Sequence, residues 1–299
     1  MIKGIDLFCG CGGLSKGFEE AGYKIVAAFD NWDIATEVYS MNFNHTVIKA
    51  NIEELDIEEY KKEDIDLVIG GPPCQDFSSA GKRDESLGRA ELTEVFAIKV
   101  CEILPKWFVM ENVERIKKSP YLLSVKETFK KNGYGLTEIV LDASLCGVPQ
   151  KRKRYFLIGG LKEEDDFLKE SLEKNLAKKS MTVREYFGDK LGVEHYYRHP
   201  RSYQRRAIFS IDEPSPTIRG VNRPIPSTYV FHKGDTCKDR EKIRALTSEE
   251  RMMLQTFPKD FKLKGTKTEI EQMIGNAVPV NLAKYVGNCL KEYINEKNV

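Results

Sequence analysis

The feature that most constrains the fold is a regular alternation of short apolar runs and amphipathic segments between residues 1 and 160. Strands alternating with helices indicate a mostly parallel sheet covered by helices on both faces, so we predict an α/β fold. The predicted strands are Gly4–Phe8, Lys24–Phe29, Asp66–Ile69, Lys106–Met110, Gly135–Leu141 and Arg154–Gly159. The predicted helices lie near Leu14–Ala21, Ile34–Asn42, Leu92–Leu104 and Tyr121–Asn132.

Several polar or reactive side chains fall at or just after the ends of these predicted strands. Phe8, Asp30, Cys74 and Glu111 all have this position. Ligands of parallel sheets bind beyond the carboxyl ends of the strands. We therefore expect one crevice to hold all four residues.

Cys74 follows Pro72 and Pro73 at the end of the apolar run Leu67–Ile69. Each proline fixes its own φ and restricts the residue before it, so the thiol is presented from a rigid strand end. This placement suits a nucleophile. The segment alone is equally compatible with a small buried cysteine beside a turn.

The pattern changes near Leu161. Residues 162–179 are rich in Lys and Glu and are predicted to form a charged, solvated helical linker. Residues 182–239 contain five prolines and are predicted to be irregular. A helix is expected over Thr247–Thr256, where Thr247 and Glu250 match a capping box, and a last helix over Val280–Tyr293.

Composition excludes several classes of protein. The net charge of +1 provides no global field for nucleic acid, so any such binding depends on local patches. The seven cysteines have no framework spacing, which indicates free thiols in a reducing cytoplasm, and no metal site is predicted. No apolar run is long enough to span a membrane, and no secretory signal is recognisable.

Five short motifs carry a resemblance to a known family. They are Asp6-Leu7-Phe8-Cys9-Gly10-Cys11-Gly12-Gly13, Pro73-Cys74-Gln75, Glu111-Asn112-Val113, Gln150-Lys151-Arg152-Lys153-Arg154 and Gly275-Asn276-Ala277-Val278-Pro279. In this order and spacing the chain closely resembles the cytosine-C5 DNA methyltransferases over roughly residues 4–160 and 243–292. The resemblance implies a Rossmann-like catalytic domain with a smaller, irregular target-recognition domain. We assign residues 1–178 plus 270–299 to the first and 179–269 to the second.

The resemblance also implies S-adenosyl-L-methionine as cofactor. The first turn lacks the complete Gly-x-Gly-x-x-Gly order that suits a dinucleotide pyrophosphate. Asp30 is expected to accept from the ribose hydroxyls, although a helix N-cap is the alternative role. Asn51 stands where the family usually has Asp, so weaker adenine binding is expected. The implied cofactor residues are Phe8, Gly10, Gly12, Asp30, Asn31, Trp32, Asn51, Ile52, Pro73, Leu92, Asn276, Ala277 and Val278.

For catalysis, the resemblance implies that Cys74 attacks C6 of cytosine as a thiolate. Glu111 would bond N3 and the exocyclic amine of the base. Arg154, with Arg152 close by, would lower the thiol pKa and hold the base carbonyl. Solvation or phosphate contact remains the alternative role for the two arginines. The target atom is inaccessible in a stacked duplex, so the base must be flipped out.

Duplex DNA is the implied partner, and two segments supply candidate contacts. Residues 76–91 are predicted to be a catalytic loop, and 196–224 concentrate arginine, the side chain that reads guanine bidentately. Backbone-only contact is the alternative. The predicted DNA-binding residues are Gln75, Ser78, Lys82, Arg83, Arg89, Arg198, Arg201, Arg205, Arg206, Arg219 and Arg223. We expect a cytoplasmic monomer, acting in a restriction-modification system beside an endonuclease of the same specificity.

Three alternatives stay open at this point. A tRNA cytosine methyltransferase would share the chemistry, but its typical Cys-Phe-Thr tripeptide is absent here. A non-catalytic DNA-binding homologue would usually lack Cys74 or Glu111, and this chain has both. An NAD-dependent Rossmann enzyme would require the complete glycine pattern.

Overall fold

A central sheet forms where the apolar runs predicted it, in the computed structural model that describes residues 1–62, 64–73, 91–202 and 204–297. Among these residues the sheet has seven strands in the order β3-β2-β1-β4-β5-β8-β6. Five of them, β3, β2, β1, β4 and β5, pair in parallel, whereas β8 is antiparallel to β5. Their bounds are β1 Lys3–Leu7, β2 Lys24–Asp30, β3 Thr46–Lys49, β4 Leu67–Gly70, β5 Trp107–Val113, β6 Tyr134–Asp142 and β8 Lys153–Leu161.

Contacts divide the chain into two compact units, described here one at a time. Unit 1 comprises Met1–Leu141, Lys153–Leu176 and Ala283–Val299. Unit 2 comprises Asp142–Arg152 and Ala177–Leu282. The sequence-based domain assignment placed 142–152 and 270–282 with the catalytic domain, and this functional boundary stays a prediction.

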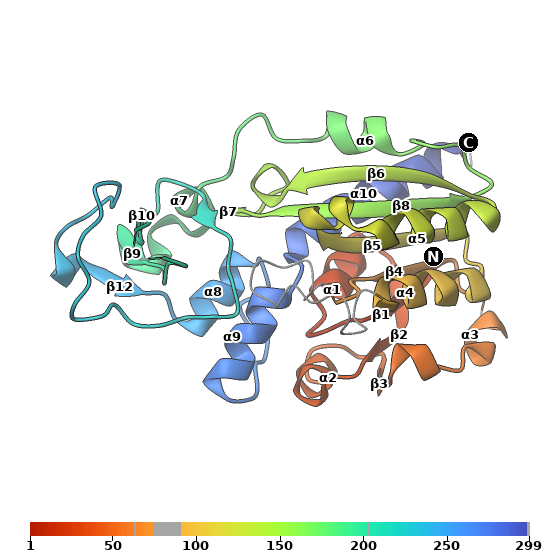
Figure 1. Ribbon diagram of the computed structural model, residues 1–299, viewed down its shortest axis with the longest axis horizontal. Helices are drawn as coiled ribbons and strands as arrows, with labels where there is room; N and C mark the ends of the chain where they lie inside the picture. The colour runs from red at the N-terminus through yellow and green to blue at the C-terminus, as the bar shows by residue number, and fades with distance from the viewer. Residues whose placement is uncertain (63, 74–90, 203, 298–299) are drawn as a thin grey trace. The chain divides into compact units, whose positions relative to one another are not determined.

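The helices of unit 1 cover the sheet, and Figure 1 shows α4 and α5 side by side. Aromatic rings fill the core between these two helices and the strands: Phe96 of α4, Phe129 of α5 and Phe108 of β5 are fully buried. Near its middle, α10 is tied to the residue before β2 by a hydrogen bond from the Tyr23 hydroxyl to the Gly287 carbonyl, 2.9 Å long. The helical bounds are α1 Gly13–Glu20, α2 Asp33–Ser40, η1 Ile52–Glu54, α3 Glu58–Lys62, α4 Glu91–Ile103, η3 Glu114–Lys118, α5 Pro120–Lys131, α6 Lys169–Lys174 and α10 Val280–Lys297, the start of which lies in unit 2.

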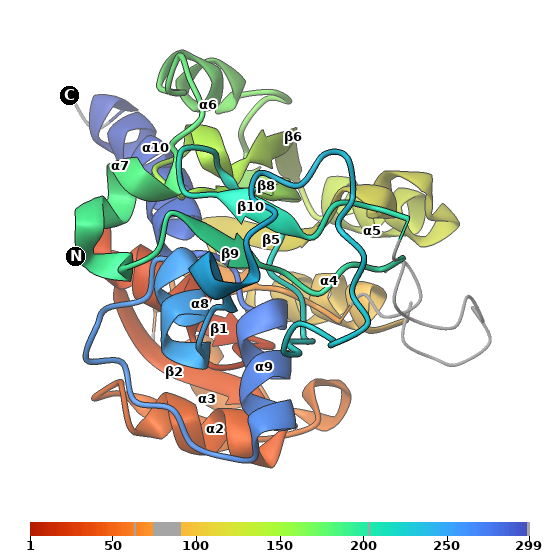
Figure 2. The ribbon, with the colours of Figure 1, turned by 90° about the vertical axis from the view of Figure 1, so that its left-hand side faces the viewer.

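Unit 2 has more regular structure than its sequence suggested. The segment 182–239 was predicted to be irregular, yet it contributes α7, β9, β10 and β11. Strand β9 pairs with β10 antiparallel and with β12 parallel, and α8 lies beside α9 (Figure 2). The bounds are η4 Ala143–Leu145, β7 Gln150–Lys151, α7 Val183–Phe187, η5 Gly188–Leu191, β9 His195–Tyr197, β10 Ile208–Ser210, β11 Ser215–Pro216, η6 Arg240–Lys242, β12 Ile243–Ala245, α8 Ser248–Leu254 and α9 Lys267–Asn276.

Local sequence signals fix several element ends. The predicted capping box is confirmed: Thr247 accepts from the Glu250 backbone, and the Glu250 side chain accepts from the Thr247 backbone. In contrast, the charged segment 162–179 is helical only over Lys169–Lys174. Glu111 was expected just after a strand but lies within β5, because β8 extends the pairing as far as Val113.

The described residues contain neither a helix suited to a membrane nor a cluster of metal ligands. None of their helices is both long and apolar enough to cross a membrane. Their His, Cys, Asp and Glu side chains form no group of three or more that could hold a metal ion.

Candidate active site

The turn between β1 and α1 has an unusual backbone. Phe8, Gly10 and Gly12 all have positive φ, at 67°, 53° and 94°. A positive φ is uncommon for a bulky residue such as Phe8, and such strain is concentrated at functional sites. A Cβ on Gly12 would lie 2.4 Å from the Phe43 ring, whereas one on Gly10 would meet nothing within 4 Å. The turn is therefore closely packed at Gly12 and faces open space at Gly10.

Asp30, the last residue of β2, is tied to this turn. One carboxylate oxygen accepts from the Gly10 backbone N–H at 2.8 Å, and the other accepts from the Trp32 N–H at 2.9 Å. Burial raises the Asp30 pKa, and the backbone N–H groups oppose this rise. Each carboxylate oxygen has lone-pair capacity for a second donor. Asp30 can therefore accept from ligand hydroxyls while it holds the turn, and this open, acidic turn fits an adenosyl cofactor without a phosphate.

The remaining predicted cofactor residues of unit 1 have more ordinary surroundings. The Asn51 side chain is exposed, and its oxygen accepts from the Glu53 N–H at 3.3 Å, capping η1. Ile52 is only 2% exposed and packs in the core. Asn31 is exposed, whereas Trp32, Pro73 and Leu92 are half-buried.

Glu111 and Arg154 form an ion pair across β5 and β8. Glu111 lies opposite Phe156, and Val113 lies opposite Arg154, so the two charged side chains are diagonal neighbours on one face of the sheet. Their closest atoms, Arg154 Nε and Glu111 Oε1, are 2.8 Å apart, and the side chains are 13% and 10% exposed. The pair therefore places a carboxylate and a guanidinium together in a largely desolvated position.

The same strand also holds the backbone that leads to Cys74. A Cβ on Gly71 would lie 3.3 Å from Glu111 Oε2, so this carboxylate lies against the segment 71–73. Asn112, only 2% exposed, donates from Nδ2 to the Pro72 carbonyl at 3.4 Å. Sequence reasoning did not assign a role to Asn112, although a buried amide beside Glu111 in the motif was the available signal. Cys74 lies outside the described residues, as do Gln75, Ser78, Lys82, Arg83 and Arg89.

The Arg152 side chain, in unit 2, is buried and donates hydrogen bonds to main-chain carbonyls. It is 1% exposed and donates to the carbonyls of Ile218, Gly275 and Ala277 at 2.8, 2.8 and 3.1 Å. Three carbonyl partners neutralise much of the cost of burying a guanidinium. This geometry gives Arg152 a structural role, and its catalytic role stays a prediction.

The predicted C-terminal cofactor element lies in unit 2 at the end of α9. Asn276 is exposed and Val278 is 7% exposed. The Ala277 carbonyl accepts from Arg152 and also from the Gln255 side chain at 3.1 Å. These bonds fix the backbone of the Asn276–Val278 segment.

The structure separates the six predicted DNA-binding arginines of unit 2 into two groups. Arg198 donates to the Thr217 carbonyl at 2.7 Å, Arg219 to the His199 carbonyl, and Arg206 to Glu213. Arg201, Arg205 and Arg223 are exposed, and their side chains make no hydrogen bond or ion pair with any residue that the structure describes. The second group is therefore available to a ligand without breaking existing bonds.

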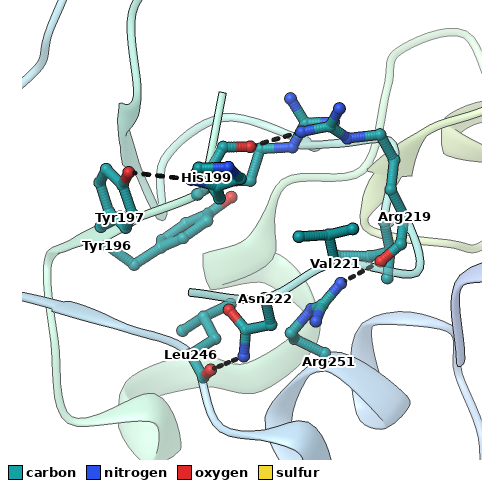
Figure 3. A pocket seen from close by; sticks show the side chains of 10 residues that line it. Tyr196, Tyr197, His199, Arg219, Val221, Asn222, Leu246 and Arg251 are labelled. Atoms are coloured by element: carbon teal, nitrogen blue, oxygen red, sulfur yellow. Dashed lines mark hydrogen bonds between the residues drawn. The ribbon is translucent and has the colours of Figure 1, made fainter. Parts of the chain in front are cut away.

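A basic pocket lies beside the first group (Figure 3). Arg198, Arg219, His199 and Arg251 contribute to its lining. Burial, and after it the charges of Arg219 and Arg201, lower the pKa of Arg198 to about 10. His199, Asn222 and Arg251 were not predicted as site residues. The available signal for His199 and Asn222 was their position in the arginine-rich segment 196–224, whereas Arg251 lies outside it.

Comparisons with known proteins show the family of this chain. Residues 2–292 match the model of the C-5 cytosine-specific DNA methylase family. The chain is 58% identical to the Type II methyltransferase M.HindV of Haemophilus influenzae, over 99% of this chain and 98% of that protein. It is 54% identical to the Type II methyltransferase M.HgiDI of Herpetosiphon aurantiacus, over 99% and 96%.

Solved structures match the fold at lower identity. The S. pombe Dnmt2 methyltransferase superposes with a TM-score of 0.71 at 18% identity, over 100% of both chains. A putative DNA modification methyltransferase from an E. coli prophage gives 0.70 at 24% identity, over 99% of this chain and 100% of that one. The Rossmann-like α/β fold predicted from the sequence is thereby confirmed. The chain belongs to the C-5 cytosine-specific DNA methylase family and is a methyltransferase that uses S-adenosyl-L-methionine.

Proposed function

We propose that this protein methylates C5 of a flipped-out cytosine in a specific duplex DNA sequence, through a covalent bond from Cys74 to C6. The observation that carries the proposal is the Glu111–Arg154 pair, in which the Glu111 carboxylate lies against Gly71, three residues before Cys74. A nucleophile, a carboxyl and a fixed cation are the groups that addition to a cytosine ring requires.

In this mechanism the Cys74 thiolate adds to C6, and the ring becomes an enamine with electron density at C5. Glu111 bonds N3 and the exocyclic amine, where charge develops during the addition. Arg154 orients Glu111 and holds the base carbonyl. S-adenosyl-L-methionine supplies an electrophilic methyl group. After transfer a water molecule takes up the C5 proton, the C–H bonding pair re-forms the C5–C6 double bond, and the C6–S pair leaves with Cys74 as its thiolate.

The cofactor would occupy the Phe8–Gly13 turn. Gly10 faces open space there, and Asp30 retains lone pairs for the ribose hydroxyls. The exposed Asn31 and the half-buried Trp32 would lie near the adenine, and Pro73 and Leu92 would wall the site. Asn276, Ala277 and Val278 would close over the methionine end.

Target recognition would fall to unit 2. Its exposed arginines are suited to guanine edges or phosphates. The relatives M.HindV and M.HgiDI are named Type II methyltransferases. We therefore propose a modification methylase, acting as a monomer, whose cognate endonuclease cuts the same site.

The direct test incubates the protein with methyl-labelled cofactor and either duplex DNA or tRNA, and then maps the labelled bases. We expect label at C5 of cytosine within one recurrent DNA sequence and none in tRNA. Label confined to tRNA would replace DNA with RNA as the substrate. No transfer to either would refute the catalytic proposal.

A further inference from the structure

A chain of hydrogen bonds runs from the core of unit 1 toward the surface, next to the turn Phe8–Gly13, the proposed cofactor turn. The Ser15 hydroxyl lies 2.5 Å from the Asp6 carboxylate and accepts from the Tyr39 hydroxyl at 2.8 Å. The Tyr39 oxygen is 2.7 Å from His45 Nε2, and His45 Nδ1 is 3.2 Å from Glu19 Oε1. None of these five residues belongs to the proposed catalytic or cofactor contacts.

At the buried end of this hydrogen-bond chain, Asp6 and Ser15 lie on either side of the turn in the sequence. Asp6 lies two residues before Phe8 in β1, and Ser15 lies two residues after Gly13 in α1, so their bond spans the base of the turn. Ile5 and Leu7 pack in the core cluster, and Asp6 must therefore face the opposite side of the sheet. Tyr39 also stacks on Phe43, the ring against which Gly12 packs. Moving these side chains would move the turn.

The exposed fraction of the side chains increases along the hydrogen-bond chain from Asp6 to Glu19. Asp6, Ser15 and Tyr39 are fully buried, the His45 side chain is 11% exposed, and the Glu19 side chain is 30% exposed. The second oxygen of Asp6, Oδ1, has no hydrogen-bond partner among the described residues. Protons can therefore enter from solvent only at the His45–Glu19 end.

The electrostatic surroundings of Asp6 disfavour its negative charge. The Asp6 pKa is raised to about 8. Burial is the largest cause, the hydrogen bond from Ser15 opposes the rise, and the charge of Asp30 contributes to it. Burial and the charge of Asp6 likewise raise the pKa of the neighbouring Cys9 thiol. The charged groups facing the outer end are Glu19 and Lys16 of α1; Lys16 Nζ lies 6.0 Å from the Phe43 ring centroid.

Two proton arrangements satisfy every bond in the chain. In the first, Asp6 is ionised, each hydroxyl donates toward it, and His45 is an imidazolium that donates to Tyr39 and Glu19. In the second, protonated Asp6 donates to Ser15, Ser15 to Tyr39 and Tyr39 to neutral His45, which still donates to Glu19. Both arrangements hold the same number of protons. One proton can thus pass between His45 and Asp6 without exchange with solvent.

We propose that Asp6, Ser15, Tyr39 and His45 form a proton-sharing relay that positions the cofactor turn and lets the charge of Asp6 respond to the charge of the bound ligand. The relay rests on the proposed placement of the cofactor at this turn. A cationic ligand favours the arrangement with ionised Asp6, whereas a ligand without the cation leaves Asp6 protonated. The four side chains act as positioning residues.

The test compares binding of S-adenosyl-L-methionine with that of S-adenosylhomocysteine, which lacks the sulfonium charge. Ser15→Ala and Tyr39→Phe each interrupt the relay. We expect either change to weaken S-adenosyl-L-methionine about tenfold, the scale of one charge-assisted hydrogen bond. S-adenosylhomocysteine should weaken by less than about threefold, since no charge is stabilised. The matched control is Tyr23→Phe, which removes another tyrosine hydroxyl bond of unit 1, and it should leave the ratio of the two affinities unchanged.

A spectroscopic measurement on the wild-type protein tests the position of the proton directly, so this test does not depend on whether a variant folds. The ring nitrogens of His45 in the wild-type protein should shift toward imidazolium when S-adenosyl-L-methionine binds, and not when S-adenosylhomocysteine binds. Tyr39→Phe should abolish this response. Identical His45 spectra with both ligands, or an unchanged affinity ratio in both relay variants, would overturn the relay. Failure of the wild-type protein to bind either ligand would instead refute the cofactor site.

Discussion

Replacing Glu111 with Gln tests the catalytic pair most directly. Glu111→Gln keeps the shape of the side chain, and the amide oxygen can still accept from Arg154 Nε, now 2.8 Å from Oε1. It removes the charge and the ability to share a proton with N3 of the base. We expect the methyl-transfer rate to fall by about 100-fold or more, which corresponds to about 2.7 kcal/mol of transition-state stabilisation.

The structure also predicts a separate effect of this change on stability. Arg154 is 13% exposed and would lose its charged partner. The bond to Gln keeps its charged donor, but the buried guanidinium loses the carboxylate that neutralises it, so the free energy of unfolding should fall by about 1–3 kcal/mol. Single-turnover transfer of labelled methyl groups to duplex DNA measures the first effect, and urea unfolding measures the second.

Glu138→Gln is the matched control for Glu111→Gln. Glu138 lies on β6, accepts from Lys126 and Tyr155, and takes no part in the proposed chemistry. This control should lower stability and leave the transfer rate within about twofold of wild type. A Glu111→Gln rate within twofold of wild type would assign Glu111 a purely structural role. Equal loss of rate in both variants would show that the loss follows from stability alone.

Four further predictions concern other groups. Cys74→Ser should abolish turnover while cofactor binding persists in calorimetry; turnover near the wild-type rate would exclude covalent catalysis. Asp30→Ala should weaken S-adenosyl-L-methionine more than DNA, and an unchanged cofactor affinity would contradict the ribose assignment. Changing Arg201, Arg205 or Arg223 to Ala should, for at least one of them, relax the preference at one base pair by about 1–3 kcal/mol; three unchanged methylation patterns would place recognition elsewhere. The folded-state pKa of Asp6, about 8, exceeds the ordinary value of 3.8. The stability of the wild-type protein should therefore decline relative to that of Asp6→Asn as the pH rises from 4 to 8, by up to about 1.4 kcal/mol per pH unit. If urea unfolding gives the same difference in stability between the two proteins at pH 5 and at pH 8, this result would count against a buried proton.

Local patterns were sufficient to predict six of the seven strands described in the sheet of unit 1. Apolar runs bounded by glycine and proline located all six predicted strands, because strands buried on both faces need continuous apolar sequence. Strand β3 escaped notice because its four residues, Thr46–Lys49, begin and end with exposed polar side chains. Its pairing with β2 is a long-range contact that no local pattern encodes.

The candidate site was only partly predictable for the same reason. The ion pair of Glu111 with Arg154 depends on the antiparallel register of β5 and β8, which joins residues 43 positions apart. The role of Arg152 depends on carbonyls 66, 123 and 125 positions away along the chain. The Gln-x-Arg-x-Arg motif identified Arg152 and Arg154 as candidate site residues, but it did not indicate which partners these side chains meet.

The hydrogen bonds that Arg152 donates to main-chain carbonyls have a consequence for protein engineering. Arg152 and Gln150 bind Ile218 and Gln255, and Asn281 donates to the Gly147 carbonyl, so 142–152 and 276–282 are integral to unit 2. A chimera that exchanges only residues 179–269 with those of a relative would cut through this network, because one of the three carbonyls that Arg152 binds, that of Ile218, lies inside the exchanged segment and the other two lie outside it. A transplant of new sequence specificity into this scaffold should therefore carry both flanking segments, with its junctions placed after Leu141, between Arg152 and Lys153, before Ala177 and after Leu282.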